Sequence, residues 1–294
     1  MEGRKEVRVR ASTSARNMLI TSAFEYKSRR NNMPTILLTN DDGIQSVGLL
    51  ALKKRLEKLG NVIVVAPEHE RSGIGKALTT GRIEIVETRL RDDSKAYATT
   101  GTPGDAFLLA TSKILKRMPD LLVAGINLGP NLAVDDLLNS GTLGAALEAA
   151  IHHVPAIAVS YCLAEITEQQ AEKDKVTEKQ LELAAIIAQK AAKYVLQKGM
   201  PSEVDIVSIN VPERVDSKSV EITSLSYKGY GDIYSEQNGG YKIMNWALKN
   251  YPDDAPGTDL YAIKKKKAIS ITPIKLKLFH NKKGLEELSK ALAT

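Results

Sequence analysis

The sequence predicts an α/β protein with a three-layer, Rossmann-like core and a mostly parallel sheet. From Met33 onward, short aliphatic runs alternate with amphipathic segments, and polar or glycine-bearing stretches separate them. This alternation is typical of right-handed strand–helix–strand units, which place helices on both faces of a sheet. We expect the core over residues 33–212. Residues 213–294 are expected to form an appended β-hairpin region and a terminal helix.

The first half of the core follows from aliphatic runs and from the residues that end them. Leucines after residue 46 have helical spacing, and Gly60 is a typical C-cap residue. Pro67 closes the second aliphatic run, and Thr102 with Pro103 suits the start of a helix. The expected elements are, in order, strand 36–39, helix 46–59, strand 61–66, strands 82–89 and 96–99 of a β excursion, and helix 103–116.

The second half continues the alternation and then changes in character. Small residues favour a closely packed helix at 141–150, and Gly199 caps an amphipathic helix at 181–196. Residues 163–178 are polar and predict a loop or the start of a solvent-facing helix, and Lys264 to Lys267 predict a solvated turn between strands. The remaining expected elements are strands 121–124, 156–160 and 205–211, β material at 220–234, 241–246 and 268–274, and helix 284–292.

Composition excludes several classes of protein. No apolar stretch approaches the roughly 18 residues that span a bilayer, so no membrane partner is expected. A single cysteine, Cys162, excludes an internal disulfide and suits a reducing compartment, so we expect a cytoplasmic protein. Four histidines and one cysteine disfavour a His/Cys zinc site.

The formal charge of +6 is concentrated in a leader at residues 1–32, which has eight basic and three acidic residues, a net +5. The rest of the chain is about neutral, so its charge gives no argument for binding nucleic acid. The leader is either a targeting peptide or a run ahead of a true start at Met33. We favour the second interpretation because the apolar segment of a secretory peptide is missing. In both cases we expect it to be unstructured.

An acidic turn follows the first strand and is the most informative feature of the chain. Asn40-Asp41-Asp42-Gly43 separates a buried strand from an amphipathic helix, which places both carboxylates at the ligand-binding edge of an open α/β sheet. Adjacent carboxylates repel each other unless a cation or a proton lies between them. Oxygen-rich sites of this kind suit Mg²⁺ or Mn²⁺. The alternative is an Asx turn combined with a helix N-cap, which these residues would also form.

Two further loops and one helix start are expected at the same edge of the sheet. The loops are 71–75, which contains Ser72, and 125–131, which contains Asn127. A hydroxyl and an amide oxygen would complete a ligand set for a hard cation. Ser140-Gly141-Thr142 opens a helix of small residues, which is either an anion site or an ordinary N-cap. A hard cation beside an anion-binding helix start suggests phosphoryl chemistry.

The order and spacing of these segments resemble the SurE (survival protein E) family of metal-dependent nucleotide phosphatases. The resemblance spans roughly residues 34–275 and departs from the family pattern at Gly104, at Ala106 and over residues 227–252. The first 32 residues have no family counterpart. The matching residues are Ile36–Ile44, Val64–Pro67, Arg71–Gly73, Gly101–Pro103, Asp105, Pro119–Leu122, Gly125–Gly129, Ser140–Ala146, Pro155–Ser160, Ile209–Pro212, Gly257–Asp259 and Ile269–Pro273.

The resemblance implies a 5′-nucleotidase, with 3′-nucleotidase and exopolyphosphatase activities also found across the family. It also implies one divalent metal ion per subunit, Mg²⁺ or Mn²⁺, and a homodimer with exchanged C-terminal elements, which could pair into a tetramer. The implied metal ligands are Asp41, Asp42, Ser72 and Asn127. We expect Asp41 and Asp42 to be the catalytic residues, and the substrate phosphate to be held by Asn40, Gly43, Asn131, Ser140, Gly141 and Thr142.

Two other functions remain open from the sequence alone. The same loops could form a nucleotide-binding module without catalysis, or a phosphatase that acts on sugar phosphates or polyphosphate. The motifs predict residues that would bind the phosphate group of a ligand. They do not predict the residues that would recognise a base.

Overall fold

A computed structural model describes residues 33–163, 175–215, 219–243, 247–277 and 285–293. The leader at 1–32 and most of the polar segment predicted at 163–178 therefore lie outside the described residues. All the elements described below lie within the unit that begins at Thr35.

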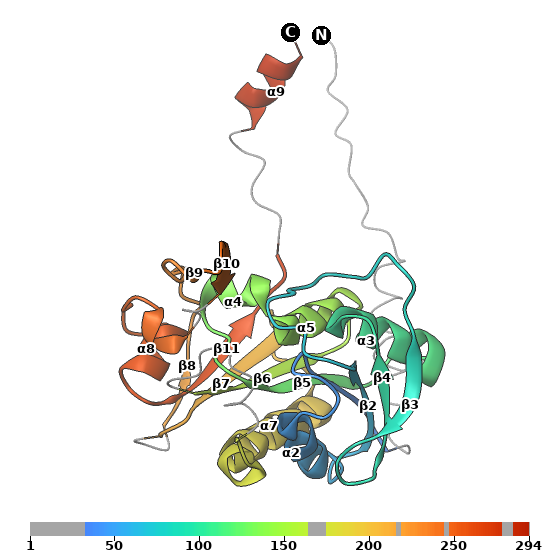
Figure 1. Cartoon of the computed structure of the whole chain (residues 1–294). Helices are drawn as coiled ribbons and strands as arrows, with labels where there is room; N and C mark the ends of the chain where they lie inside the picture. Colours follow the sequence, from blue (N-terminus) through green and yellow to red (C-terminus); the bar gives the residue numbers. More distant parts are fainter. Residues whose placement is uncertain (1–32, 164–174, 216–218, 244–246, 278–284, 294) are drawn as a thin grey trace, which may run out of the picture. The chain divides into compact units, whose positions relative to one another are not determined.

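The core is a nine-stranded, mostly parallel sheet (Figure 1). Its inner strands are parallel, whereas β3 pairs antiparallel with β4 and β11 pairs antiparallel with β7. Across the sheet the order is β3 (Ile85–Arg89), β4 (Lys95–Thr99), β2 (Asn61–Pro67), β1 (Thr35–Thr39), β5 (Leu121–Leu128), β6 (Ala156–Cys162), β7 (Ile206–Pro212), β11 (Ile269–Ile274) and β8 (Val220–Ile222).

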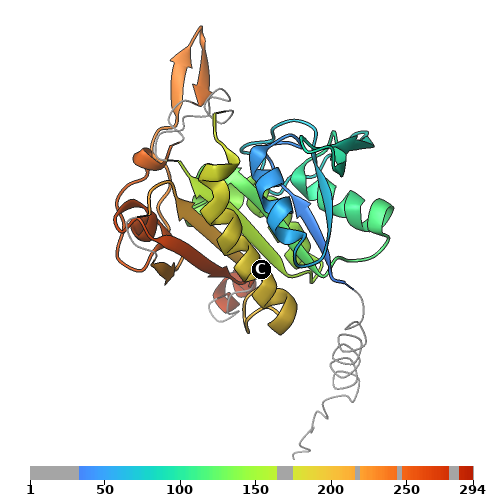
Figure 2. The same cartoon turned by 90° about the horizontal axis from the view of Figure 1, so that it is seen from below.

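Helices cover both faces of this sheet, which confirms the predicted three-layer core. On one face, α2 (Val47–Leu56) packs beside α7 (Glu178–Lys198), as Figures 1 and 2 show. On the other face, α3 (Pro103–Leu109) packs beside α5 (Gly141–Ile151). A π-helix, Ala110–Leu115, continues α3, so the single helix predicted at 103–116 has two parts. A short helix, α4 (Ala133–Asn139), precedes α5.

Each face of the sheet has its own hydrophobic core. Leu52 of α2 and Leu181 of α7 belong to one cluster of buried side chains, and Phe107 of α3 and Leu143 of α5 belong to the other. Full burial of such a side chain contributes about 1.5–3 kcal/mol relative to exposure. The sequence therefore predicted these four helices, and the structure shows which side chains each of them buries.

Two strands from the C-terminal part of the chain join the main sheet, β8 and β11. The strand predicted at 268–274 is present as β11, where it pairs antiparallel with β7 and parallel with β8. A separate hairpin consists of β9 (Tyr234–Gln237) and β10 (Gly240–Ile243), and a terminal helix is α9 (Glu286–Leu292). These elements confirm the appended hairpin and terminal helix, while the domain boundary at residue 212 stays a prediction.

Other local predictions also differ from the structure, and the β material predicted at 220–234 forms a strand only at β8 and at the start of β9. Lys264 ends helix α8 (Asp259–Lys264), so the lysine run follows a helix and the predicted turn between two strands is wrong. The first strand of the β excursion starts at Ile85, whereas the sequence predicted residue 82. Strand β5 continues through Gly125 to Leu128, beyond its predicted end at residue 124, with a register shift against β6.

Close backbone packing explains why a glycine lies inside β5. Gly125 has a φ of +125°, and a Cβ atom there would lie 2.3 Å from the carbonyl oxygen of Val159 on β6. Only glycine tolerates both conditions, and a glycine inside a strand often marks such an irregularity. In the sequence, Gly125 suggested that the strand ends at residue 124. In the structure, the same glycine allows β5 to continue past this position.

Candidate active site

The acidic turn lies at the point where the strand order of the sheet reverses. From β1 the chain moves to β2 on one side, and β5 then pairs with β1 on the other side. Ligands of open α/β sheets bind at such a switch point, outside the carboxyl ends of the strands. Asn40 donates from Nδ2 to the Gly43 carbonyl at 2.9 Å, and Gly43 has a φ of +99°. The turn is therefore closed by its own residues, and Ser46 caps α2 directly after it.

Asp41 is packed against the start of α5. Its side chain is 4% exposed, and Oδ1 accepts a hydrogen bond from the Thr142 hydroxyl. A Cβ atom on Gly141 would lie 2.7 Å from the Cβ of Asp41, so only glycine permits this approach. Ser140 caps the helix by accepting from the backbone N–H of Leu143 at 3.2 Å. The positive end of the helix dipole therefore lies close to the Asp41 carboxylate.

Asp42 is connected to the end of β5. Its Oδ2 accepts a hydrogen bond from the backbone N–H of Leu128 at 3.2 Å, directly beside Asn127. Asn127 donates from Nδ2 to the Gly129 carbonyl at 2.9 Å, so Oδ1 is the atom of this side chain that can act as a ligand. The structure thus brings Asp42 and Asn127 together from segments 85 positions apart.

The loop after β2 reaches the same place. The backbone N–H of Arg71 donates to the Asp41 carbonyl at 2.7 Å, which places Ser72 next to the acidic turn. The exposed Ser72 hydroxyl donates to Oε1 of Glu70 at 2.6 Å. The sequence analysis did not single out Glu70. Glu70 lies two positions before Ser72, a predicted metal ligand, and this proximity is the feature of the sequence that could have indicated it.

The two asparagines predicted to hold phosphate have different surroundings. Asn131 is buried, and its Nδ2 donates to the Ser160 hydroxyl at 2.8 Å, so this nitrogen is committed to the interior. Asn40 is fully buried, and its Oδ1 has no hydrogen-bond partner within the described part of the chain. Buried polar atoms are usually paired, so an unpartnered oxygen beside two carboxylates suits a ligand that brings a donor or a cation.

The donor set fits a hard cation. Asp41, Asp42, Ser72 and Asn127 offer carboxylate, hydroxyl and amide oxygens, which are the ligands of Mg²⁺ and Mn²⁺. In the described ranges, no three His, Cys, Asp or Glu side chains form a metal-binding group. The predicted ligands are therefore two carboxylates and two neutral oxygens. Because Mg²⁺ takes six oxygen ligands, four protein donors leave coordination positions for water and substrate.

A polar clamp holds the segment that connects β5 to α4. We use this name for the side chains and backbone groups that bind the main chain of residues 131–134. Both backbone groups of Asn131 bind the side-chain amide of Asn210, and the other contacts come from Asp136 and from C-terminal residues. These contacts are Leu132 N to Asp136 Oδ2 (2.8 Å), Tyr251 Oη to Leu132 O (3.0 Å), Ala133 N to Asp259 Oδ2 (2.7 Å) and Val134 N to Ser226 O (2.8 Å).

Asp259 is the charged centre of the polar clamp. It is 0% exposed and accepts from the backbone N–H groups of Ala133, Ser226 and Leu260. Burial raises the pKa of this carboxyl, and these hydrogen bonds oppose the rise. Ala133 has a φ of +62°, a conformation that costs free energy for a residue with a side chain. The clamp therefore maintains a conformation that the segment would not adopt alone.

Apolar packing covers the polar clamp. Leu132, Cys162, Leu260 and Ile263 belong to a third buried cluster, in which the rings of Tyr230 and Tyr251 lie 3.7 Å apart between centroids. Burial raises the pKa of the Cys162 thiol and of both tyrosine hydroxyls. Cys162 is thus an inert core residue.

Fold and site together define a class of protein: a three-layer α/β protein with paired carboxylates at the switch point of its sheet, one of which packs against a helix start. The chain belongs to the SurE family, because the family model described as Survival protein SurE matches residues 36–232. The match includes every residue that we predicted to bind metal or phosphate.

Individual relatives agree with this assignment. A protein named 5′-nucleotidase SurE from Methanobrevibacter smithii is 37% identical over 246 residues, covering 82% of this chain and 94% of its own length. One of the same name from Methanosarcina acetivorans is 36% identical over 247 residues, covering 83% and 92%. The crystal structure of the SurE protein from Aquifex aeolicus is similar with a TM-score of 0.67 and 30% identity, covering 89% of this chain and 100% of that one.

The helices offer no candidate for a membrane span. Over the part of the chain that the structure describes, none is both long enough and apolar enough to cross a bilayer.

Proposed function

We propose that this protein is a cytoplasmic 5′-nucleotidase that depends on one divalent metal ion, Mg²⁺ or Mn²⁺, and hydrolyses nucleoside monophosphates to nucleoside and phosphate. The observation that carries the proposal is the position of the Asp41–Asp42 pair at the switch point of the sheet, with Asp41 packed against the start of α5. Relatives named 5′-nucleotidase SurE, which align over most of the chain, support the same substrate class.

In this proposal, Asp41, Asp42, Ser72 and Asn127 hold the metal ion. When bound there, the ion would supply Lewis acidity toward a phosphate oxygen and would lower the pKa of water. A carboxylate oxygen of the Asp41–Asp42 pair would accept the proton of the attacking water. The hydrogen bonds from Thr142 and from Leu128 N orient these two carboxylates before substrate binds.

The phosphate lies at the start of α5 in the same proposal. The first N–H groups of a helix have no partner within the helix and attract anions. Gly141 lets the substrate phosphate approach both the helix start and Asp41, while Gly43 and Asn40 form the opposite wall. Asn131 contributes through the position of its backbone, since its side-chain nitrogen binds Ser160.

Metal removal tests the proposal directly. We expect EDTA to abolish phosphate release from AMP, and Mg²⁺ or Mn²⁺ to restore it after the chelator is removed, because the donor set holds a hard cation. A panel of 5′- and 3′-nucleoside monophosphates, sugar phosphates and polyphosphate then ranks the substrates by kcat/KM. Nucleotide binding without metal-dependent phosphate release would identify a binding module. A higher kcat/KM for sugar phosphates or polyphosphate than for every nucleotide would overturn the substrate class.

A homodimer, which could pair into a tetramer, is part of the proposal. The β9–β10 hairpin is a two-stranded sheet with exposed Tyr234 and Tyr241, and such hairpins are marginal alone. Helix α9 and the residue before it expose Leu285, Leu288 and Leu292 at helical spacing. A second copy of the chain would cover these side chains. We expect light scattering at micromolar concentration to give at least twice the monomer mass, and a monodisperse monomer would contradict this.

A further inference from the structure

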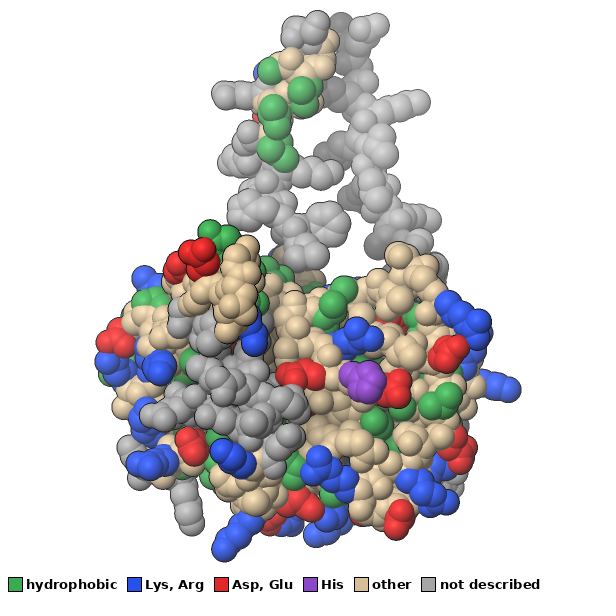
Figure 3. All heavy atoms as spheres, in the orientation of Figure 1, with side chains coloured by type: hydrophobic (Ala, Val, Ile, Leu, Met, Phe, Trp, Pro, Cys, Tyr) green, Lys and Arg blue, Asp and Glu red, His purple; other side chains and the backbone are tan. Residues whose placement is uncertain are grey.

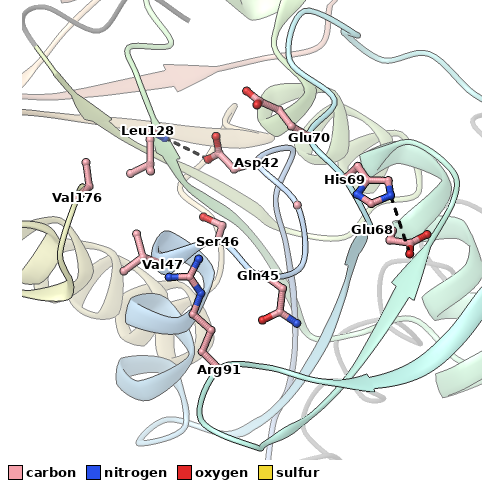
Figure 4. Close-up of a pocket in the computed structure, with 11 residues that line it drawn as sticks. Asp42, Gln45, Ser46, Val47, Glu68, His69, Glu70, Arg91, Leu128 and Val176 are labelled. Atoms are coloured by element: carbon pink, nitrogen blue, oxygen red, sulfur yellow. Dashed lines mark hydrogen bonds and ion pairs between the residues drawn. The ribbon is translucent and has the colours of Figure 1, made fainter. Parts of the chain in front are cut away.

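A cavity of about 280 Å³ opens beside Asp42 (Figure 4). Asp42 and Gly43 form one end, and the loop after β2, the start of α2 and the β3–β4 turn form the other walls. Its volume lies close to the lower limit, about 300 Å³, of pockets that bind small molecules. The lining residues are Asp42, Gly43, Gln45, Ser46, Val47, Glu68, His69, Glu70, Arg91, Leu128 and Val176.

The cavity lies on the open side of the acidic pair. On the other side, Gly141 lies against Asp41 and Thr142 is fully buried. A phosphate ester held at the acidic pair consists of a phosphoryl group and a leaving group, and only the phosphoryl group must contact the metal. The cavity beside Asp42 opens next to this group, so it can receive the leaving group.

The charges of the lining suit an uncharged leaving group. A metal ion would neutralise Asp42, which leaves Glu68 and Glu70 against Arg91, the one Lys or Arg that lines the described cavity. Figure 4 shows the Arg91 guanidinium directed toward Ser46 and Val47, with the glutamates on other walls. A polyphosphate chain would add negative charge to a lining that is already negative by one unit. A nucleoside adds none, and its hydroxyls and ring nitrogens can pair with Gln45, Arg91 and the carboxylates.

We propose that this cavity is the leaving-group subsite, and that Glu68 and Arg91 set its preference for a nucleoside over a polyphosphate chain. This inference rests on the proposed phosphatase function. It adds a location for the nucleoside and an electrostatic basis for selecting it.

Two charge-changing variants of the full chain test the subsite, Glu68→Gln and Arg91→Gln. The measurements are kcat/KM for AMP and the inhibition constant of tripolyphosphate against AMP hydrolysis, at low ionic strength and fixed free Mn²⁺. We expect Glu68→Gln to lower the tripolyphosphate inhibition constant by about three- to tenfold and Arg91→Gln to raise it by a similar factor, since each changes one charge near a partly exposed site. Both effects should diminish in about 0.5 M salt because screening lengths shorten.

Matched controls are Glu87→Gln and Arg82→Gln, whose side chains are exposed and lie outside the cavity. They are expected to leave both constants within twofold of the unmodified protein. The subsite would be overturned if tripolyphosphate had the same inhibition constant in Glu68→Gln, in Arg91→Gln and in the controls. It would also be overturned if Glu68→Gln and Arg91→Gln both raised, or both lowered, that inhibition constant. If the unmodified protein releases no phosphate from AMP with Mg²⁺ or Mn²⁺, the proposed function itself fails, which is a separate result.

Discussion

Replacing Asp42 by Asn is expected to lower kcat for AMP hydrolysis by about two to four orders of magnitude, with little change in stability. The substitution removes one of the two negative charges that would hold the cation and accept a proton. The new side chain keeps an oxygen that can accept the hydrogen bond from Leu128 N, so the turn keeps its connection to β5. Asp41→Asn should have an effect of similar size.

The measurement is steady-state phosphate release at saturating Mn²⁺, with thermal unfolding of each variant as the check on folding. Asp93→Asn is a matched control, because Asp93 lies in the β3–β4 turn and does not line the cavity. Near-normal turnover of Asp42→Asn at saturating Mn²⁺ would remove Asp42 from the catalytic assignment.

Replacing Asp259 by Ala is expected to cause the largest loss of stability. The carboxylate is fully buried and accepts three backbone hydrogen bonds, from Ala133, Ser226 and Leu260. A buried donor that loses its acceptor costs about 1–3 kcal/mol, so we expect a loss of about 3 kcal/mol or more in the free energy of unfolding. The remaining folded protein should also show a reduced kcat, since the segment next to Asn131 loses its support.

Guanidinium titrations of the full chain measure this loss as a shift of the unfolding midpoint. Asp253→Asn is the control on the same segment, because the Asp253 side chain is exposed and forms ion pairs with Lys264 and Lys265. We expect its midpoint to match that of the unmodified protein within error. An Asp259→Ala midpoint that also matches would show that the polar clamp does not stabilise the fold.

The part of the site that the sequence predicted is local in the chain. Asn40 to Gly43 follow an aliphatic strand and precede a capped helix, so a few neighbouring residues determine both the turn and its place at the sheet edge. The loops with Ser72 and Asn127 were expected at the same edge, because parallel strands place their carboxyl ends together. These predictions needed only secondary structure and the rule that connects strand order to ligand sites.

The parts that the sequence did not predict depend on distant partners. Helix α4 is short, and its first residue, Ala133, has a positive φ that the Asp259 contact supports, so no local pattern indicates where it begins. Strand β11 was predicted as a strand, but an alternating pattern does not specify which neighbour it pairs with. Glu70 and Arg91 lie on loops that are distant in the sequence, and only the folded structure shows that both line the cavity beside Asp42.

The dependence of Ala133 on Asp259 also bears on how the protein is made. The two residues are separated by 126 positions, and β11, which follows α8, is inserted between β7 and β8. When residue 212 has been added to the nascent chain, all the predicted ligands have been synthesised, but the roughly 50 residues that complete the support of their loop have not. At roughly 5–20 residues per second, the nascent chain passes several seconds with this loop unsupported. Activity should therefore begin only after the C-terminal strand has docked, and a chaperone that binds nascent chains would meet the unfinished sheet edge at β7 during that interval.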